Sequence, residues 1–142
     1  KGFIKVFGGN QSRPNLHIDD MCELYKILIM NDIKKFNGEI FNAGTENLKI
    51  IEVAKKVKSI IDKKYNFSTD IRIEHSEDIR SYMINSEKIK NKLGFKFKKS
   101  VDHAIQDLCE AFDTKKIVDS FSDKWSNIKV LLKKEKQVNF NE

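Results

Sequence analysis

Apolar residues recur every three or four positions in three stretches of this 142-residue chain. This spacing is the period of an α-helix, and it predicts amphipathic helices over residues 21–30, 50–61 and 101–112. In the first of them, extra apolar residues widen the stripe, so we expect this helix to be covered on two sides. Asp20 followed by Glu23 is typical of a capped helix start.

Shorter patterns along the chain indicate strands. Strand-forming or alternating residues at 3–7, 39–44 and 70–74 predict three strands, and residues 16–18 leave room for only a small fourth one. Strands that alternate with helices are typical of α/β proteins. The sequence therefore predicts an α/β fold built on one thin sheet.

The helical pattern weakens after residue 113. We therefore expect a folded portion over residues 1–114 and a charged C-terminal extension over residues 115–142, with a frayed tail from Lys133. The chain starts at Lys1 rather than at a methionine, and we interpret this start as an internal cut. No stretch is apolar over the roughly 18 residues that are needed to cross a bilayer, so no membrane partner is expected.

The chain is basic, with a net charge of +6 and a sequence pI near 9.2. A basic surface can bind nucleic acid or membranes, or it can be a solvated, lysine-rich face. Arginine, which makes the bidentate contacts of nucleic-acid readers, occurs only at positions 13, 72 and 80. The solvated face is the favoured interpretation, and no nucleic acid is expected as a partner.

The two cysteines, Cys22 and Cys109, lie far apart and within predicted helices. Neither belongs to a Cys-x-x-Cys pair or lies near a histidine at the spacing of metal ligands, so the sequence indicates neither a zinc site nor a redox motif. Isolated thiols of this kind predict buried, reduced cysteines in a cytoplasmic protein.

Four blocks follow one another along the chain: RPNLHIDD at residues 13–20, GEIFNAG at 38–44, DIRSY at 78–82, and SEKI at 86–89 with LGF at 93–95. In this order and spacing they resemble the extended short-chain dehydrogenase/reductase family, which contains the NAD-dependent nucleotide-sugar epimerases and dehydratases. The resemblance covers most of the chain. It corresponds to the C-terminal part of such enzymes only.

The resemblance implies an incomplete enzyme. Members of the family carry a Gly-x-x-Gly-x-x-Gly loop that binds NAD and a catalytic Tyr-x-x-x-Lys pair, but Tyr25, Tyr65 and Tyr82 have no lysine four residues on. We therefore expect no catalytic, cofactor-binding or metal-binding residue here, NAD bound by a missing N-terminal part, and no activity of the chain alone. The implied fold is a C-terminal substrate-binding lobe plus the last helix, residues 21–30, and the last strand, residues 40–41, of a Rossmann-type sheet.

The family's substrates are nucleoside-diphosphate sugars, and the resemblance assigns their binding to five residues. Arg13 and Arg80 are expected to clamp the pyrophosphate, because a guanidinium offers a rigid fork of donors to phosphate oxygens. Asn15 and Leu48 are expected near the nucleotide, and Asp78 is expected to accept a hydrogen bond from a ribose hydroxyl. Without the resemblance, surface ion pairs between the arginines and nearby carboxylates are the simpler interpretation.

The resemblance further implies a homodimer and a reaction through a keto-sugar intermediate. The chain is then the substrate-binding part of an NAD-dependent nucleotide-sugar epimerase or dehydratase, and the sequence does not separate these two activities. The alternative is a basic helical module that binds nucleic acid or a protein partner through lysines 133, 134 and 136.

Overall fold

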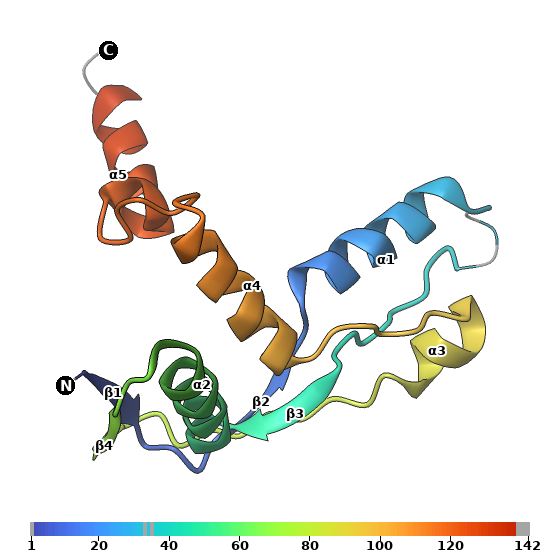
Figure 1. Cartoon of the computed structure of the whole chain (residues 1–142). Coiled ribbons are helices and arrows are strands. Elements are labelled where there is room, and N and C mark those ends of the chain that lie inside the picture. Colours follow the sequence, from blue (N-terminus) through green and yellow to red (C-terminus); the bar gives the residue numbers. More distant parts are fainter. Residues whose placement is uncertain (1, 33, 35, 139–142) are drawn as a thin grey trace. The chain divides into compact units, whose positions relative to one another are not determined.

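The computed structural model describes residues 2–32, 34 and 36–138. The chain divides into two compact units, Lys1–Leu108 and Cys109–Glu142 (Figure 1). All strands that the structure describes belong to the first unit. The expected boundary after residue 114 separates functional portions, and it stays a prediction.

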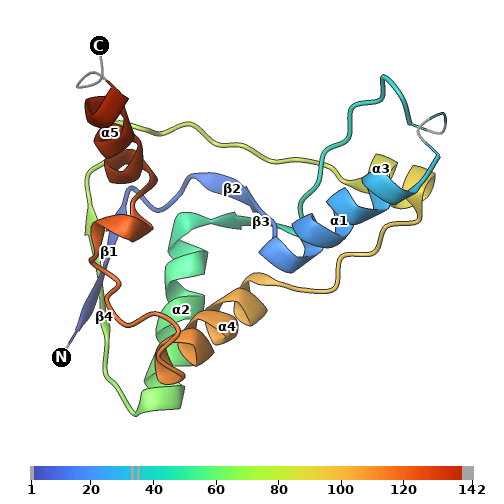
Figure 2. The same ribbon diagram turned by 90° about the horizontal axis from the view of Figure 1, so that it is seen from above.

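The core of the first unit joins two helices that lie side by side in Figure 2, α1 (Ile18–Met30) and α3 (Glu87–Leu93). Leu24 of α1 packs with Ile89 of α3 and with Phe95, and Ile89 is fully buried. Burial of these side chains is the main favourable contribution to holding the two helices together. The apolar period of α1 predicts Leu24 and Leu28 on this inner face, but Tyr25, which the same period predicts there, is exposed.

The rest of the surface of α1 is open in this structure. Its side chains are large, apolar and exposed: Ile18, Tyr25, Ile29 and Met30. The sequence predicts cover on two sides of this helix, but only one side is covered by the described residues. An exposed apolar surface on a helix is typical of an interface.

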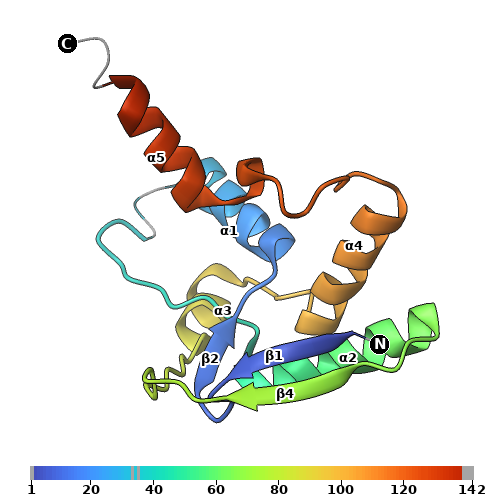
Figure 3. The ribbon, with the colours of Figure 1, turned by 90° about the vertical axis from the view of Figure 1, so that its left-hand side faces the viewer.

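A parallel pair of strands, β1 (Phe3–Phe7) and β4 (Asp70–Glu74), forms where the sequence predicts strands. Figure 3 shows the two strands side by side, with α2 (Ile50–Tyr65) next to them. Val6 of β1 and Ala54 of α2 are buried. Parallel strands need a long crossover connection, and here α2 is its last element.

A second pair of strands is antiparallel and consists of β2 (Ser12–Asn15) and β3 (Glu46–Lys49). The prediction of one thin sheet is therefore wrong, since each pair forms a sheet of its own. β2 also lies earlier than the small strand considered at residues 16–18. Pro14 within β2 lacks an N–H donor, and a strand at a sheet edge tolerates this loss.

Residues 39–44 do not form the predicted strand. A strand needs a neighbour that completes its ladder of hydrogen bonds, and no described strand pairs with this segment. Single side-chain contacts hold its backbone instead. Lys88 Nζ donates to the Ile40 carbonyl at 2.8 Å, and the Gly44 N–H donates to Ser86 Oγ at 3.0 Å.

The start of α1 also differs from the prediction. The helix begins at Ile18, and His17 is its N-cap, with Nδ1 accepting a backbone N–H of the first turn at 3.1 Å. Asp20 is not a cap, because it is buried and its carboxylate accepts the backbone N–H groups of Lys98 and Lys99. The carboxylate of Asp20 in α1 thereby satisfies two backbone N–H groups that lie far along the sequence.

The C-terminal part of the chain is more helical than predicted. After α4 (Val101–Asp113), which the sequence predicts, come a short 3-10 turn, η2 (Asp123–Trp125), and α5 (Asn127–Val138). The tail that was expected to fray from Lys133 is therefore helical through the end of α5, and residues 139–142 lie outside the described residues. Among the helices that the structure describes, none has the length and apolar character to pass through a bilayer.

The two cysteines differ in burial. Cys109 is buried, as predicted. Cys22 lies on α1 and is exposed, so the prediction of a buried thiol is wrong at this position. The reason is that the part of α1 that carries Cys22 is not covered by the described residues.

Candidate functional site

Two segments that are far apart in the sequence meet beside β2: the turn after β1 and the loop between β4 and α3. Gln11 is buried in the turn and accepts the Gly9 N–H through Oε1 at 2.6 Å. Its Nε2 donates to the carbonyl of Phe7 at 3.2 Å and to that of Asp78 at 2.8 Å. One buried amide therefore positions the loop that carries Asp78 and Arg80.

The same loop runs along β2. The Tyr82 N–H donates to the Ser12 carbonyl at 2.9 Å, and the Ser12 N–H donates to Ser81 Oγ at 2.7 Å. The loop has no regular secondary structure, so these bonds and those of Gln11 define its course. They bring the loop next to Arg13 of β2.

Arg13, Asp78 and Arg80 form one cluster, which we call the arginine cluster. Arg80 donates to Asp78 with Nε at 2.8 Å and with Nη2 at 3.0 Å, which makes a bidentate pair. Arg13 reaches the same carboxylate with Nη2 at 3.4 Å, and its Nη1 donates to the carbonyl oxygens of Arg80 and Ser12. The family resemblance predicts these three residues at one site, and the structure brings them together.

The arginine cluster has a positive net charge, because two guanidinium groups share one carboxylate. The Arg80 guanidinium, with a smaller contribution from Arg13, lowers the pKa of Asp78 to about 2, so this carboxylate is ionised at neutral pH. The Arg13 side chain is 28% exposed and lies over the Tyr82 ring, 5.0 Å from its centroid, whereas the Arg80 side chain is 70% exposed. An anion that binds here would therefore contact Arg13, which is held in place, and Arg80, which faces solvent.

The other two predicted site residues are placed by the register of β2 and β3. Leu48 is the partner of Arg13 across the antiparallel pair, so both side chains lie on the same face of the sheet. Asn15 follows Arg13 by two positions, but its Nδ2 donates to the Arg13 carbonyl at 2.8 Å and lies 3.5 Å from the Glu46 carbonyl. Leu48 therefore borders the arginine cluster, whereas the Asn15 amide is used within the protein. Contact of either residue with a nucleotide stays a prediction.

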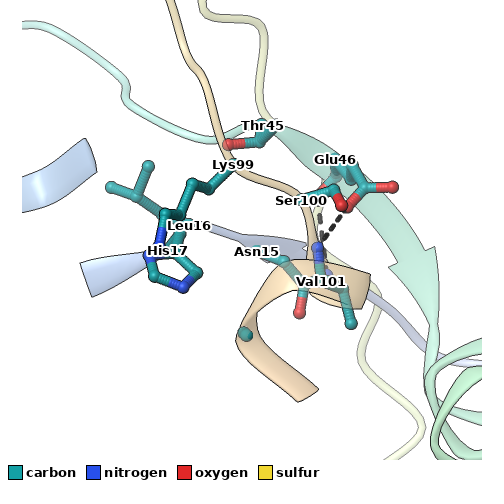
Figure 4. Close-up of a pocket in the computed structure, with 9 residues that line it drawn as sticks. Asn15, Leu16, His17, Thr45, Glu46, Lys99, Ser100 and Val101 are labelled. Carbon is teal, nitrogen blue, oxygen red and sulfur yellow. Dashed lines mark hydrogen bonds between the residues drawn. The ribbon is translucent and has the colours of Figure 1, made fainter. Parts of the chain in front are cut away.

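A small cavity of about 160 Å³ lies beside the start of α4 (Figure 4). It is mostly apolar, and Asn15 and Thr45 contribute to its lining. Glu46 Oε2 accepts the Val101 N–H at 2.8 Å, drawn as a dashed line in Figure 4, so a carboxylate of the protein already occupies the helix start. Because this carboxylate already accepts the first N–H group of α4, the cavity is not an anion site at the helix start. Thr45 Oγ1 is buried without a hydrogen-bond partner among the described residues.

One group of potential metal ligands occurs among the described residues, and it consists of His17, Asp19 and Asp107. His17 is buried, and its Nε2 lies 3.1 Å from Asp107 Oδ2. The Lys99 ammonium lies 2.8 Å from a carboxylate oxygen of Asp107 and 2.8 Å from one of Asp19, and these contacts raise the pKa of Lys99. A cation of the protein thus occupies the place that a metal ion would take, and the group has a structural role.

Sequence reasoning missed Gln11, Ser81 and Tyr82. Tyr82 belongs to the DIRSY block, so its closeness to an arginine is visible in the sequence, although no role follows from it there. Gln11 and Ser81 act through bonds between residues that are 67 and 69 positions apart, respectively. No local pattern marks such bonds, because both residue types are ordinary in turns and loops.

No protein-family model matches the chain. Among curated proteins, the chain is 30% identical over 105 residues to a UDP-glucose 4-epimerase from Mycoplasma genitalium, and the match covers 70% of this chain and 30% of that protein. Among solved structures, it is similar to the dTDP-glucose 4,6-dehydratase of Bacillus anthracis in complex with NAD, with a TM-score of 0.64, 23% identity, and coverage of 80% of this chain and 35% of the other. It is also similar to the UDP-glucose 4-epimerase of Thermotoga maritima with UDP-glucose, with a TM-score of 0.62, 23% identity, and coverage of 79% and 35%.

The curated match in sequence is to a UDP-glucose 4-epimerase, and an enzyme of the same name is among the matches in fold. As a partial chain, this protein is related to the extended short-chain dehydrogenase/reductase family. It spans 30% of the curated relative and 35% of each of the two solved chains, which is about a third of their length. The α/β class predicted from the sequence is confirmed, and the structural neighbours are Rossmann-type enzymes that the chain covers only in part.

The glycine turn after β1 does not fit a dinucleotide-binding loop. Gly8 and Gly9 follow β1 with positive φ angles, but the Gly8 N–H donates to the Glu74 carbonyl at 2.8 Å and the Gly9 N–H donates to Gln11. The chain then continues into β2, whereas a dinucleotide-binding loop opens a helix whose N-terminus meets the pyrophosphate. This turn holds the protein together and offers no cradle for NAD.

Proposed function

We propose that this chain is the substrate-binding portion of an NAD-dependent nucleotide-sugar epimerase or dehydratase that acts through a keto-sugar intermediate. The observation that carries the proposal is the arginine cluster, in which Arg13 and Arg80 meet at Asp78. UDP-glucose and dTDP-glucose, which give the relatives their names, each contain a diphosphate. Two arginines beside one another are the feature of this chain that fits such a group.

The geometry of the arginine cluster suits a diphosphate. A diphosphate carries about two negative charges, and guanidinium groups bind phosphate oxygens through charge-assisted hydrogen bonds. Arg80 has five N–H donors, of which the pair with Asp78 uses two. A diphosphate can therefore bind Arg80 without displacing Asp78. Arg13, held by the carbonyls of Ser12 and Arg80, supplies the second positive charge.

The remaining site residues take supporting roles in this proposal. Both oxygens of Asp78 accept hydrogen bonds from arginine, so its first role is to orient the guanidinium groups, and a ribose hydroxyl is an additional donor to it. Leu48 shares a face with Arg13 and borders the nucleotide. Asn15 contributes by holding the Arg13 carbonyl. The substrate-binding surface is then built mainly from one strand, β2, and one loop.

The proposal assigns NAD and the reacting groups to a part of the enzyme outside this chain. We propose that this part covers the open face of α1 and pairs with residues 39–44, and that the whole enzyme is a cytoplasmic homodimer. The exposed apolar side chains of α1 support this arrangement, as does the fact that the chain spans about a third of its relatives. In the bound enzyme, NAD supplies the hydride acceptor, and the residues of this chain bind and orient the substrate.

Calorimetry with UDP, dTDP and GDP tests the proposal on the full-length enzyme that it implies. We expect one of the three to bind, and Arg13→Ala and Arg80→Ala each to weaken that binding by roughly 10- to 100-fold, because each removes hydrogen bonds between charged groups worth about 1.5–3 kcal/mol. Arg72→Ala is the matched control. Arg72 is the third arginine of the chain and lies over the Phe3 ring, on the parallel sheet.

Two results would contradict the proposal: no binding of any of the three diphosphates, or an equal loss of affinity with Arg72→Ala. Arg13→Lys separates charge from geometry, since lysine keeps the positive charge but lacks the planar fork. If Arg13 makes a bidentate contact with phosphate, Arg13→Lys should bind the nucleoside diphosphate more weakly than the unchanged enzyme.

A further inference from the structure

The C-terminal unit carries an amphipathic helix that the proposed function does not use. Ile128, Leu131 and Leu132 of α5 lie three and four positions apart and therefore share one face of the helix. They are 71%, 60% and 51% exposed, respectively. A contiguous apolar face that is this open on a short helix indicates an interaction surface rather than a packed core.

An aromatic ring precedes this helix. Trp125 of η2 is half exposed, and the Lys124 ammonium lies 4.8 Å from the centroid of its ring. Phe121, a few residues earlier, is also exposed. An indole ring combines a large apolar surface with one polar N–H group, so it is favoured at boundaries between water and an apolar phase.

Lysines accompany the apolar face. Lys129 and Lys133 both pair with Asp123, with Nζ–Oδ distances of 2.8 and 3.1 Å, respectively, so one carboxylate of η2 holds two ammonium groups near the start of α5. Residues 123–138 contain five lysines, one aspartate and one glutamate. We call Trp125, the three apolar residues of α5 and these two lysines the α5 surface. It combines apolar side chains with a clear excess of positive charge.

We propose that the α5 surface binds to the surface of an anionic lipid bilayer. Its apolar face enters the boundary between headgroups and acyl chains, and its lysines lie among the anionic headgroups. None of the described helices can cross a bilayer, so α5 lies in the plane of the membrane. This partner differs from the expectation, drawn from the absence of long apolar stretches, that no membrane is bound.

Charge complementarity favours a membrane over the other possible occupants. A nucleic acid would pair with the lysines but would leave Ile128, Leu131 and Leu132 in water, because its phosphates bind cations and its bases stack on aromatic rings. A second copy of the chain would bring the lysines of two α5 helices together, and like charges repel. An anionic bilayer satisfies both halves of the α5 surface at once.

Co-sedimentation of the 142-residue chain with lipid vesicles tests this proposal. The two probes are vesicles of phosphatidylcholine and vesicles in which about one lipid in three is phosphatidylserine. We expect binding to the anionic vesicles that is at least roughly tenfold stronger than to the neutral ones. Trp125 is the single tryptophan of the chain, so its emission reports on this surface, and we expect it to shift to shorter wavelength with anionic vesicles only.

Paired substitutions separate the two halves of the α5 surface. Leu131→Ser with Leu132→Ser should abolish vesicle binding, and Lys129→Gln with Lys133→Gln should weaken it by roughly tenfold. The first matched control is Ile29→Ser, which removes an exposed apolar side chain from α1. The second control removes two charges from the last turn of α2, at lysines 63 and 64. Both controls should leave vesicle binding unchanged.

Several outcomes would overturn the proposal. They are an unchanged Trp125 emission with anionic vesicles, equal binding to neutral and anionic vesicles, and an equal loss of binding with the α2 control. Binding of a single-stranded RNA oligonucleotide that depends on Lys129 and Lys133, without vesicle binding, would assign the surface to nucleic acid instead. The α5 surface lies in the second unit, so a result against membrane binding would not contradict the diphosphate site proposed for the first unit.

Discussion

Asp20 is a buried carboxylate, and its removal should destabilise the first unit strongly. It lies near the start of α1, is 3% exposed, and accepts the backbone N–H of Lys98 at 3.1 Å and that of Lys99 at 3.0 Å. These two bonds connect α1 to the segment that leads into α4, 78 and 79 positions further along the chain. We expect Asp20→Ala to break this connection.

The magnitude follows from the two bonds. A hydrogen bond to a charged group contributes about 1.5–3 kcal/mol, so two such bonds contribute roughly 3–6 kcal/mol. Water that enters the vacated site can bind the two N–H groups in part. We therefore expect a loss near the lower end, about 3 kcal/mol in the free energy of unfolding, which is more than roughly a hundredfold in the folding equilibrium.

Asp19→Ala is the matched control for this substitution. Asp19 is the adjacent carboxylate in the same helical turn, its side chain is 61% exposed, and it pairs with the Lys99 ammonium at the surface. A surface pair of this kind contributes about 0–1 kcal/mol. Both carboxylates have a similar interaction with the helix dipole, so that contribution cancels in the comparison.

Urea unfolding followed by far-ultraviolet circular dichroism measures both variants. Tryptophan emission is less suitable, because Trp125 belongs to the second unit. Equal unfolding midpoints for Asp20→Ala and Asp19→Ala would refute the reasoning. Asp20→Asn refines the test: both N–H groups reach the same oxygen, Oδ2, so an amide oxygen in its place keeps both bonds but loses the charge, and we expect an intermediate loss.

Two further predictions concern the core and the arginine cluster. Ile89→Ala should cost about 2–5 kcal/mol in the urea experiment, because it leaves a cavity between α1 and α3, whereas Ile79→Ala at an exposed position should cost less than about 0.5 kcal/mol. Similar losses for both would contradict the assigned core. Arg80→Ala should raise the pKa of Asp78 from about 2 toward its usual value of 3.8 in an NMR titration of the carboxyl group, and Arg72→Ala should not. The folded-state pKa of Asp78 is depressed, so its pairing stabilises the fold above pH 3.8, and this contribution is lost as the pH falls toward 2. If the unchanged chain and Arg80→Ala still differed in stability in acid, the pairing would be contradicted.

Local patterns in the sequence were sufficient for the elements whose signal lies within a few neighbouring residues. β1 and β4 form where strand formers and alternation predict them, and α2 and α4 follow their apolar periods. The family is also visible locally, in four short blocks that stand in order. β2 and β3 were not predicted, because each has four residues and exists only through its pairing with the other.

The amino-acid sequence alone thus predicts the helices with apolar faces and the strands of the parallel pair. Through the family resemblance, it also predicts which arginines belong to the site. Only the tertiary structure decides that Asp20 holds the backbone before α4 rather than capping α1, and that none of the described strands pairs with residues 39–44. It also decides that Arg13 and Arg80 meet at one carboxylate, with Gln11 holding the loop in place. The physical reason is the same in each case. Hydrogen bonds between residues 65 to 79 positions apart depend on where the chain has packed, and no local period reports them.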